Sequence, residues 1–329
     1  MRTRIPYRFA MIFAFAGILY ACNKSNSSNN NSAGNSTANL QVQADDESRV
    51  SNETDAVAND VNITMSSKGA SVVTGAGYKS GIETSGVGTI QSLICDATVT
   101  LDTTNSSKTI TITYNGSTNC SGTRTRTGVV VISLPVGQLW STAGAQITVS
   151  IQNLKITRIR DGKSIVLNGT HIYTNVSGGR LTDLALGDVS SIKHTITGDS
   201  MQITFDDGSQ RIWNVARQRV FTFNGTGFLV TTTGLHTDGT NMGIVEWGTT
   251  RYGNSFETLI TTPMVIDQNC NFRLTAGAIE IFRKDITTNV TFGLDSTGKA
   301  TTCPGSGSYY LQAVWKGTGG SSGSVILPY

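Results

Sequence analysis

The chain has 329 residues, with 25 Lys or Arg and 22 Asp or Glu, and the first 21 residues hold three arginines and no acid, so the rest has no net charge. This excludes the strong positive field with which proteins attract nucleic acid. Only 14% of the residues are charged, whereas Gly, Ser, Thr and Asn are abundant, which favours short strands joined by turns over helices.

The N-terminus has the layout of a secretory signal. A start with three arginines precedes an apolar run over residues 9–20, which is shorter than the roughly 20 residues that cross a bilayer as a helix. Leu19-Tyr20-Ala21-Cys22 resembles the lipobox of bacterial lipoproteins, whose cysteine becomes residue one and is acylated, for example with palmitate. The resemblance implies a lipoprotein signal peptide over residues 1–21, lipidation of Cys22 and anchoring in the outer membrane, on either leaflet.

A polar segment follows the cysteine. From Asn23 to about Gln43 the chain is rich in Asn and Ser and has almost nothing to bury, so residues 22–48 are predicted to be a flexible tether. The run Gln43–Glu47 resembles the acidic export signals of Bacteroidota-type surface lipoproteins. Those signals stand directly after the cysteine, however, and we interpret this run as a solvated acidic linker.

Residues 49–90 are expected to hold one short helix and an irregular segment. Ser51–Asn62 is the helix candidate because Ser51 can cap it and acidic residues occupy its first turn. Val50, Val57 and Val61 could share the face that packs against the remainder of the protein.

From residue 91 the sequence indicates antiparallel strands. Asn-Gly or Asp-Gly pairs, typical of tight hairpin turns, begin at positions 115, 161, 168, 207, 224 and 238. Two hairpins are clearest, over residues 151–167 and 201–223. The second limb of the latter mixes Arg211, Arg217 and Arg219 with apolar residues on one alternating set, which favours a strand that leaves the core midway or bends at a bulge.

A weak internal repeat predicts two tandem sandwich-like units, residues 91–190 and 191–329, in an all-β, antiparallel fold. Asn119-Cys120 precedes Gly128-Val-Val-Val-Ile132, much as Asn269-Cys270 precedes Gly277-Ala-Ile-Glu-Ile281. The run Ile110-Thr-Ile-Thr-Tyr-Asn-Gly116, with Thr123-Arg-Thr-Arg-Thr-Gly128 behind Cys120, is similar to uncharacterised Bacteroidota-type lipoproteins that share an ITITYG…C…RTRxG pattern. That resemblance implies an envelope location and a β fold, and it carries no activity.

Four cysteines remain after Cys22, an even number that indicates disulfides in an exported protein. Their order favours Cys95 with Cys120 and Cys270 with Cys303, since each pair then encloses one strand-like segment. Four buried reduced thiols are the alternative. A zinc site is disfavoured because neither a CxxC pair nor paired histidines accompany these residues.

No catalytic, metal or cofactor motif emerges. The only GxSxG, residues 319–323, has no histidine after it, and a hairpin loop explains it better than a hydrolase elbow. The histidines stand singly, which is typical of surface or satisfied side chains. A glycosidase needs only two carboxylates, so an anchored glycoside or ester hydrolase stays open as the alternative function. The available acids are Glu246, Glu257, Glu280, Asp267 and Asp285.

The preferred function is non-enzymatic, namely binding or a structural role at the cell envelope. The membrane is the expected partner through the lipid, and a glycan or an envelope protein is the possible ligand. Trp247, Arg251 and Tyr252 lie among glycines in a predicted loop, where they could offer a stacking face and a hydrogen-bonding fork. Packing of the two aromatic residues in the core is the competing interpretation.

Overall fold

The computed structural model describes residues 37–68, 94–102, 108–118, 122–284, 286–304, 307–317, 320 and 322–329. Cys22, Cys120, Asp285 and the predicted signal peptide therefore lie outside the described residues. Residues from Ala33 onward belong to one compact unit. Its elements are α1 (Thr37–Lys68), β1 (Ala97–Asp102), β2 (Lys108–Thr118), β3 (Arg124–Leu134), β4 (Ala145–Arg158), β5 (Ser164–Asn175), α3 (Leu181–Leu186), β6 (Ile192–Phe205), β7 (Gln210–Phe223), β8 (Phe228–Gly234), β9 (His236–Thr237), β10 (Met242–Thr249), β11 (Ser255–Asp267), the 3-10 helix η2 (Gln268–Cys270), β12 (Arg273–Arg283), β13 (Ile286–Leu294), β14 (Tyr310–Gly317) and β15 (Ser322–Pro328).

The strands form one antiparallel sheet. Neighbours follow chain order from β1 to β7 and again from β10 to β15, while β8 pairs with β7 and β11, and β9 pairs with β10. This confirms the predicted all-β, antiparallel class. The predicted division into two sandwich-like units is not confirmed, because β5 and β6 flank residue 190 and pair with each other, so the sheet continues across the expected boundary.

Both predicted hairpins are present. Asp161-Gly162 connects β4 to β5, and Asp207-Gly208 connects β6 to β7, with the two glycines at φ values of 70° and 80°. The other Asn-Gly pairs are not all turns: Asn168-Gly169 lies within β5, beside a shift in its register with β6. Positive φ explains both uses of glycine, since hairpin turns and bulges each require it.

A row of such bulges bends the sheet. Register shifts occur at Gly128 in β3, at Asn153 in β4 and at Gly169 in β5, next to one another across the strands. A Cβ atom on Gly169 would stand 2.2 Å from Sδ of Met201 in β6, so this close approach depends on glycine. Because bulges increase twist and bend a strand, the aligned row creases the sheet and lets it curl around α1.

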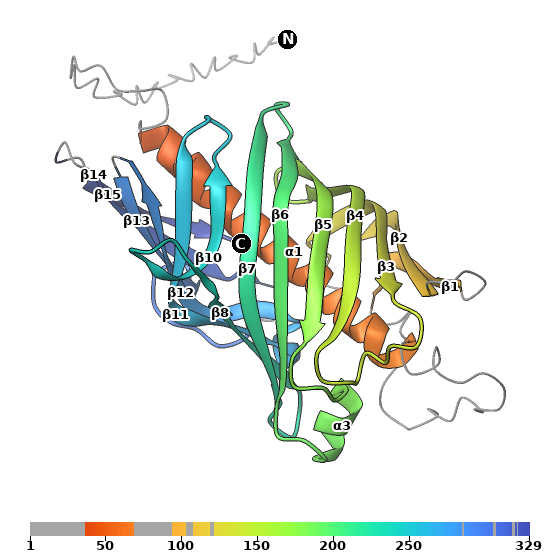
Figure 1. The fold of residues 1–329 in the computed structure, drawn as a ribbon. Coiled ribbons are helices and arrows are strands. Elements are labelled where there is room, and N and C mark those ends of the chain that lie inside the picture. Colours follow the sequence, from red (N-terminus) through yellow and green to blue (C-terminus); the bar gives the residue numbers. More distant parts are fainter. Residues whose placement is uncertain are drawn as a thin grey trace, which may run out of the picture. The chain divides into compact units, whose positions relative to one another are not determined.

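Helix α1 fills the space inside that curl (Figure 1). Between residues 42 and 65 none of its side chains is exposed. It contacts strands that are far apart in the sheet, from Tyr114 in β2 to Thr258 in β11. No helix in the described part of the chain has the length and apolar character needed to cross a membrane.

This helix corrects two expectations. It begins at Thr37 rather than Ser51, so the second half of the predicted flexible tether is helical. Asp46 and Glu47, expected in a solvated linker, are each only 4% exposed. The physical reason is tertiary: the sheet supplies the partners that stabilise a segment with little helical propensity of its own.

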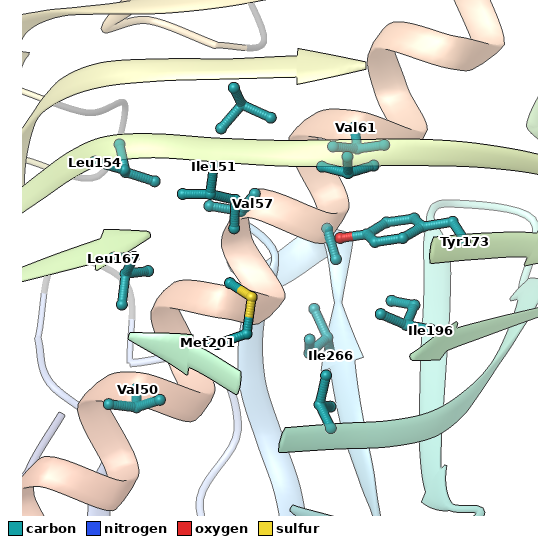
Figure 2. Close-up of a cluster of buried hydrophobic side chains, with 14 of the residues drawn as sticks. Val50, Val57, Val61, Ile151, Leu154, Leu167, Tyr173, Ile196, Met201 and Ile266 are labelled. Atoms are coloured by element: carbon teal, nitrogen blue, oxygen red, sulfur yellow. The ribbon is translucent and has the colours of Figure 1, made fainter. Parts of the chain in front are cut away.

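The apolar core lies between α1 and the middle strands (Figure 2). Val50, Val57 and Val61, the three valines expected on one helix face, are all fully buried. They meet side chains from β4, β5, β6 and β11: Ile151, Leu154, Leu167, Tyr173, Ile196, Met201 and Ile266. The predicted packing of the helix against the β structure is therefore confirmed.

One predicted disulfide is confirmed. Cys270 in η2 is bonded to Cys303, which follows β13, and their Cα atoms are 5.2 Å apart. Cys95 is disulfide-bonded as well. Its predicted partner, Cys120, lies outside the described residues.

Candidate functional site: the charged interior between helix and sheet

The three residues predicted to bind a ligand do not share one face. Trp247 lies in strand β10 rather than in a loop and neighbours the buried Glu246, so its side chain points to the outer side of the sheet. It is half-buried and stacks on His236, with ring centroids 4.0 Å apart. Tyr252 lies in the turn between β10 and β11 and is 37% exposed. Arg251 turns inward instead.

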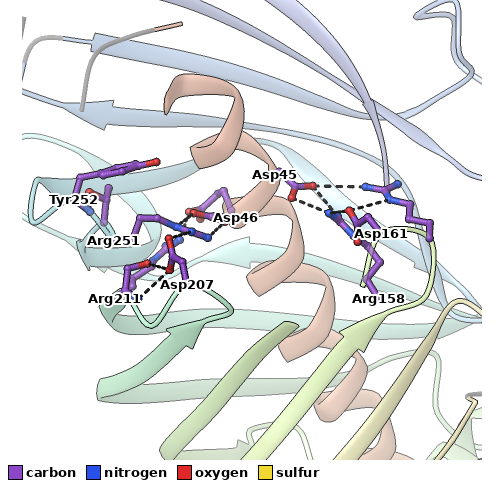
Figure 3. A network of polar contacts seen from close by, with 12 residues as sticks. Asp45, Asp46, Arg158, Asp161, Asp207, Arg211, Arg251 and Tyr252 are labelled. Atoms are coloured by element: carbon purple, nitrogen blue, oxygen red, sulfur yellow. Dashed lines mark hydrogen bonds and ion pairs between the residues drawn. The ribbon is translucent and has the colours of Figure 1, made fainter. Parts of the chain in front are cut away.

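The inward direction of Arg251 leads to the main polar feature of the molecule (Figure 3). Its Nε and Nη2 donate to the two carboxylate oxygens of Asp46 in α1, at 2.7 and 2.5 Å. Its Nη1 donates to Asp207 at 3.1 Å, and its guanidinium lies over the ring of Phe205. The three guanidinium nitrogens of Arg251 thus all form hydrogen bonds within the chain.

Seven arginines of the sheet and its turns form ion pairs with acidic residues of α1. We call this set the inner charge layer; it consists of Asp45, Asp46, Glu47, Glu53, Asp55 and Asp60 with Arg124, Arg126, Arg158, Arg160, Arg211, Arg217 and Arg251. The arginines come from β3, β4, β7, the β4–β5 turn and the β10–β11 turn, which curl around the helix. Long-range contacts of this kind have no local sequence signal.

Of the two alternatives for strand β7, the one in which it leaves the core midway is wrong; its pairing with β6 does contain a register shift, between Gly198 and Met201. Arg211, Arg217 and Arg219 are between 0% and 3% exposed. Arg217 pairs with Asp55 at 2.9 Å, and Arg219 donates to the side-chain oxygen of Asn59 at 2.6 Å. The arginines share a face with apolar residues because a polar helix, rather than a second sheet, covers that face.

Arg126 in β3 is buried and pairs with two acidic residues. Its Nε and Nη2 donate to the two carboxylate oxygens of Asp96 at 2.7 Å each, and its Nη1 donates to Asp60 at 2.8 Å. The hydroxyl of Tyr114 donates to the same oxygen of Asp60 at 2.8 Å. Burial, together with the Asp60 charge, raises the pKa of Tyr114 well above its usual value, so this phenol stays a donor.

Two carboxyl groups of the interior lie beside the same guanidinium group, that of Arg211. Glu47 in α1 pairs with Arg211 at 2.7 Å, and Glu246 in β10 lies 3.9 Å from another nitrogen of the same guanidinium. Burial and the Glu47 charge raise the pKa of Glu246 well above its usual value. Burial alone would raise the pKa of Glu47 too, but Arg211 and hydrogen bonds outweigh it and hold that pKa below the usual value. Of the two groups, Glu246 is therefore the one whose protonated form is favoured.

A carboxyl pair with unequal pKa values is chemically able to act in acid–base catalysis, so its surroundings matter. Two small cavities adjoin Glu47, and each has room for about one water molecule. Neither admits a sugar ring, which a glycosidase must place between its carboxylates. The geometry supports a structural role for this pair more than a catalytic one.

The other acids considered from the sequence lie elsewhere. Glu257 is on the outer side of β11 and accepts a hydrogen bond from Asn241 at 3.3 Å. Asp267 caps η2 through the backbone of Asn269. Glu280 is half-buried in β12. Glu47 was missed as a partner for Glu246 because its acidic run reads as a linker.

Two histidines lie in the interior without hydrogen-bond partners among the described residues. His171 and His194 are buried among aromatic rings, and burial lowers the pKa of each to about 3. The expectation of surface or satisfied side chains is wrong for these two. Among the described residues no group of His, Cys, Asp and Glu is arranged to hold a metal ion.

Comparison with protein-family models gives no match, and neither the comparison with curated proteins nor that with solved structures gives a significant similarity.

Proposed function

We propose that this chain is an exported lipoprotein, acylated at Cys22 and held at the outer membrane, with a non-enzymatic binding or structural role at the cell envelope. The signal-like N-terminus and the lipobox resemblance support the anchoring, and the confirmed disulfide is compatible with an oxidising compartment. Similarity to Bacteroidota-type lipoproteins with the ITITYG…C…RTRxG pattern is part of the same proposal.

The observation that carries the non-enzymatic role is the position of α1. The inner side of the sheet, where a curled sheet would hold a substrate, is occupied by the chain's own helix and its ion pairs. The remaining space next to the carboxyl pair admits about one water molecule. A partner would therefore meet the outer side of the sheet or its turns.

The position of α1 also defines how the anchor would hold the protein. Only residues 23–36 separate Cys22 from the start of the helix at Thr37. Fully extended, a chain of that length spans at most about 50 Å. Any pull on the lipid would pass into a helix that is held on several sides by buried pairs, rather than into an edge strand.

Metabolic labelling with a palmitate analogue tests the anchor. The parent chain should be labelled and found in the outer-membrane fraction, and Cys22→Ala should lose both the label and that location. Ser25→Ala, three residues later, is the matched control and should behave like the parent. Label that persists in Cys22→Ala would overturn the proposal.

Binding through the outer side is tested with the full-length protein in detergent on a glycan array. We expect a signal that weakens in Trp247→Ala and Tyr252→Ala, while melting temperatures stay close to that of the parent. A large loss of melting temperature in Trp247→Ala, without a glycan signal in the parent, would show that the ring serves only packing.

The hydrolase alternative has its own test on the carboxyl pair. The parent and Glu246→Gln are assayed against chromogenic esters and glycosides. Turnover by the parent that disappears in Glu246→Gln would contradict the non-enzymatic role and assign catalysis to this pair. We expect no turnover in either protein.

A further inference from the structure

One cavity at the rim of the interior has an unbalanced set of charges. It lies between the N-terminal half of α1 and strands β7, β11, β12 and β13. Its lining includes three arginines, Arg211, Arg251 and Arg283, but only two acids, Asp46 and Glu47. Arg283 is half-buried, while Glu47 of the carboxyl pair, which also lines this cavity, is buried.

The hydrogen bonds of two of these arginines are incomplete. Arg211 uses Nη1 for Glu47, while its Nε and Nη2 are buried without a hydrogen-bond partner. Arg283 donates only from Nη2, to the hydroxyl of Thr288 at 3.4 Å. Within the part of the chain that the structure describes, its Nε and Nη1 are likewise buried without a hydrogen-bond partner. In Arg251, by contrast, Nε and Nη2 donate to Asp46 and Nη1 donates to Asp207.

Arg283 differs from the arginines of the inner charge layer because it forms no ion pair with a described carboxylate. Burial lowers the pKa of its guanidinium to about 10, partly offset by the Glu47 charge. Arg211 and Arg251 each have an acidic partner, Arg251 a second one in Asp207, whereas Arg283 keeps buried charged donors unsatisfied, which is unfavourable.

We propose that this cavity binds an oxyanion, a carboxylate or phosphate group, between the guanidinium groups of Arg211 and Arg283. The planar fork of arginine matches the oxygens of both groups, and each such charge-assisted hydrogen bond is stronger than one between neutral groups. Four nitrogens of these guanidinium groups have no hydrogen-bond partner among the described residues: Nε and Nη2 of Arg211, the latter 3.9 Å from Glu246, and Nε and Nη1 of Arg283. The cavity has room for about one water molecule, so it takes an oxygen of the charged group, while the rest of the free ion or larger ligand stays at its mouth. The site does not depend on the lipid anchor or on the proposed location.

The test is a melting-temperature titration of the full-length protein in detergent at fixed ionic strength. Inorganic phosphate or acetate replaces chloride in separate arms, which distinguishes a phosphate group from a carboxylate. We expect a saturable rise in at least one arm, of about 5 °C at one hundred times the dissociation constant. Arg283→Met should abolish the rise. Its own melting temperature without the anion should equal or exceed that of the parent, because an unpaired buried charge is removed.

Arg273→Met is the matched control. Arg273 is also half-buried in β12 and lies over an aromatic ring, but it donates to the carbonyl oxygen of Gly307 and lies outside the cavity. It should keep the full response to the anion. An equal rise in the parent and in Arg283→Met would overturn the proposal.

Calorimetric titration of the parent with phosphate and with acetate keeps the proposal falsifiable if Arg283→Met fails to fold. Saturable one-site binding in either titration supports the oxyanion site. The absence of saturable heat in both contradicts it.

Discussion

Two helices of this molecule carry arginine–aspartate pairs of nearly the same length in very different surroundings. Arg217 and Asp55, which join β7 to α1, are 2.9 Å apart, and their side chains are 2% and 6% exposed. Arg180 and Asp183, at the start of α3, are 2.8 Å apart and are 44% and 19% exposed. Distance alone makes the pairs look equivalent, but burial makes them energetically different.

The difference lies in what remains when one partner is removed. At α3, water solvates the remaining ion, so such pairs contribute only about 0–1 kcal/mol. At α1 the remaining ion stays buried, and breaking a pair of this kind costs about 3–5 kcal/mol. Helix α1 has little amphipathic character, so its position relative to the sheet depends on these pairs more than on an apolar stripe.

The largest effect is expected at Arg126. Arg126→Met leaves Asp60 and Asp96 buried without their cation and should lower the free energy of unfolding by about 3–5 kcal/mol. Urea unfolding followed by tryptophan fluorescence measures it. Arg124→Met, in the same strand, is the control: its pair with Glu53 is more exposed and should cost about 1 kcal/mol. Equal losses would contradict the role of burial.

The protonated carboxyl group gives a pH-dependent prediction. The folded state keeps the Glu246 proton, whereas the unfolded state releases it above its ordinary pKa, so this residue destabilises the fold increasingly as pH rises. Glu246→Gln mimics the protonated form. Its stability relative to the parent should therefore grow from pH 5 to pH 7, by about 1.4 kcal/mol per pH unit until the pKa of the folded state is reached. A difference that stays flat over this range would exclude the raised pKa of Glu246.

Loss of an ion pair of intermediate burial should lower the free energy of unfolding by an intermediate amount. Arg158 donates two hydrogen bonds to Asp45, at 2.7 and 2.9 Å, and it also pairs with Asp161. The side chains of Arg158 and Asp45 are 16% and 15% exposed. Arg158→Met should cost about 1–2 kcal/mol in chemical unfolding, between the exposed and the buried limits. A loss as large as that of Arg126→Met would mean that number of contacts, rather than burial, sets the energy.

The smallest effect is expected at α3. Arg180→Ala removes an exposed side chain and should change the free energy of unfolding by less than about 1 kcal/mol. The same urea experiment at low and high salt measures it, and the small contribution should shrink as salt rises. A salt-independent loss above that limit would show that exposure is a poor guide in this molecule.

The local features of the fold could be predicted from the sequence. The hairpins at Asp161-Gly162 and Asp207-Gly208 follow from turn chemistry and alternation, which act between neighbours in the chain. Asn168-Gly169 was expected to be a turn and instead marks a bulge within β5. The same positive φ serves both structures, so the residue pair alone does not distinguish them.

The inner charge layer could not be predicted, because its partners lie far apart in the chain. Arg217 and Asp55 are separated by 162 residues. The sequence around Asp46 indicates a linker, since acidic residues usually remain in water. For the same reason, Arg217 indicates an interruption of the apolar face of its strand. Each residue is unfavourable by itself, and only their pairing makes both burials acceptable.

A double-mutant cycle tests most directly the claim that buried ion pairs hold α1 in the sheet. Asp55→Asn and Arg217→Met are made as two single variants and as one double variant. A second cycle with Asp183→Asn and Arg180→Met serves as the exposed reference. We predict a coupling energy of about 2–3 kcal/mol for the α1 pair and below about 1 kcal/mol for the α3 pair. Equal coupling energies for the two pairs would contradict the account.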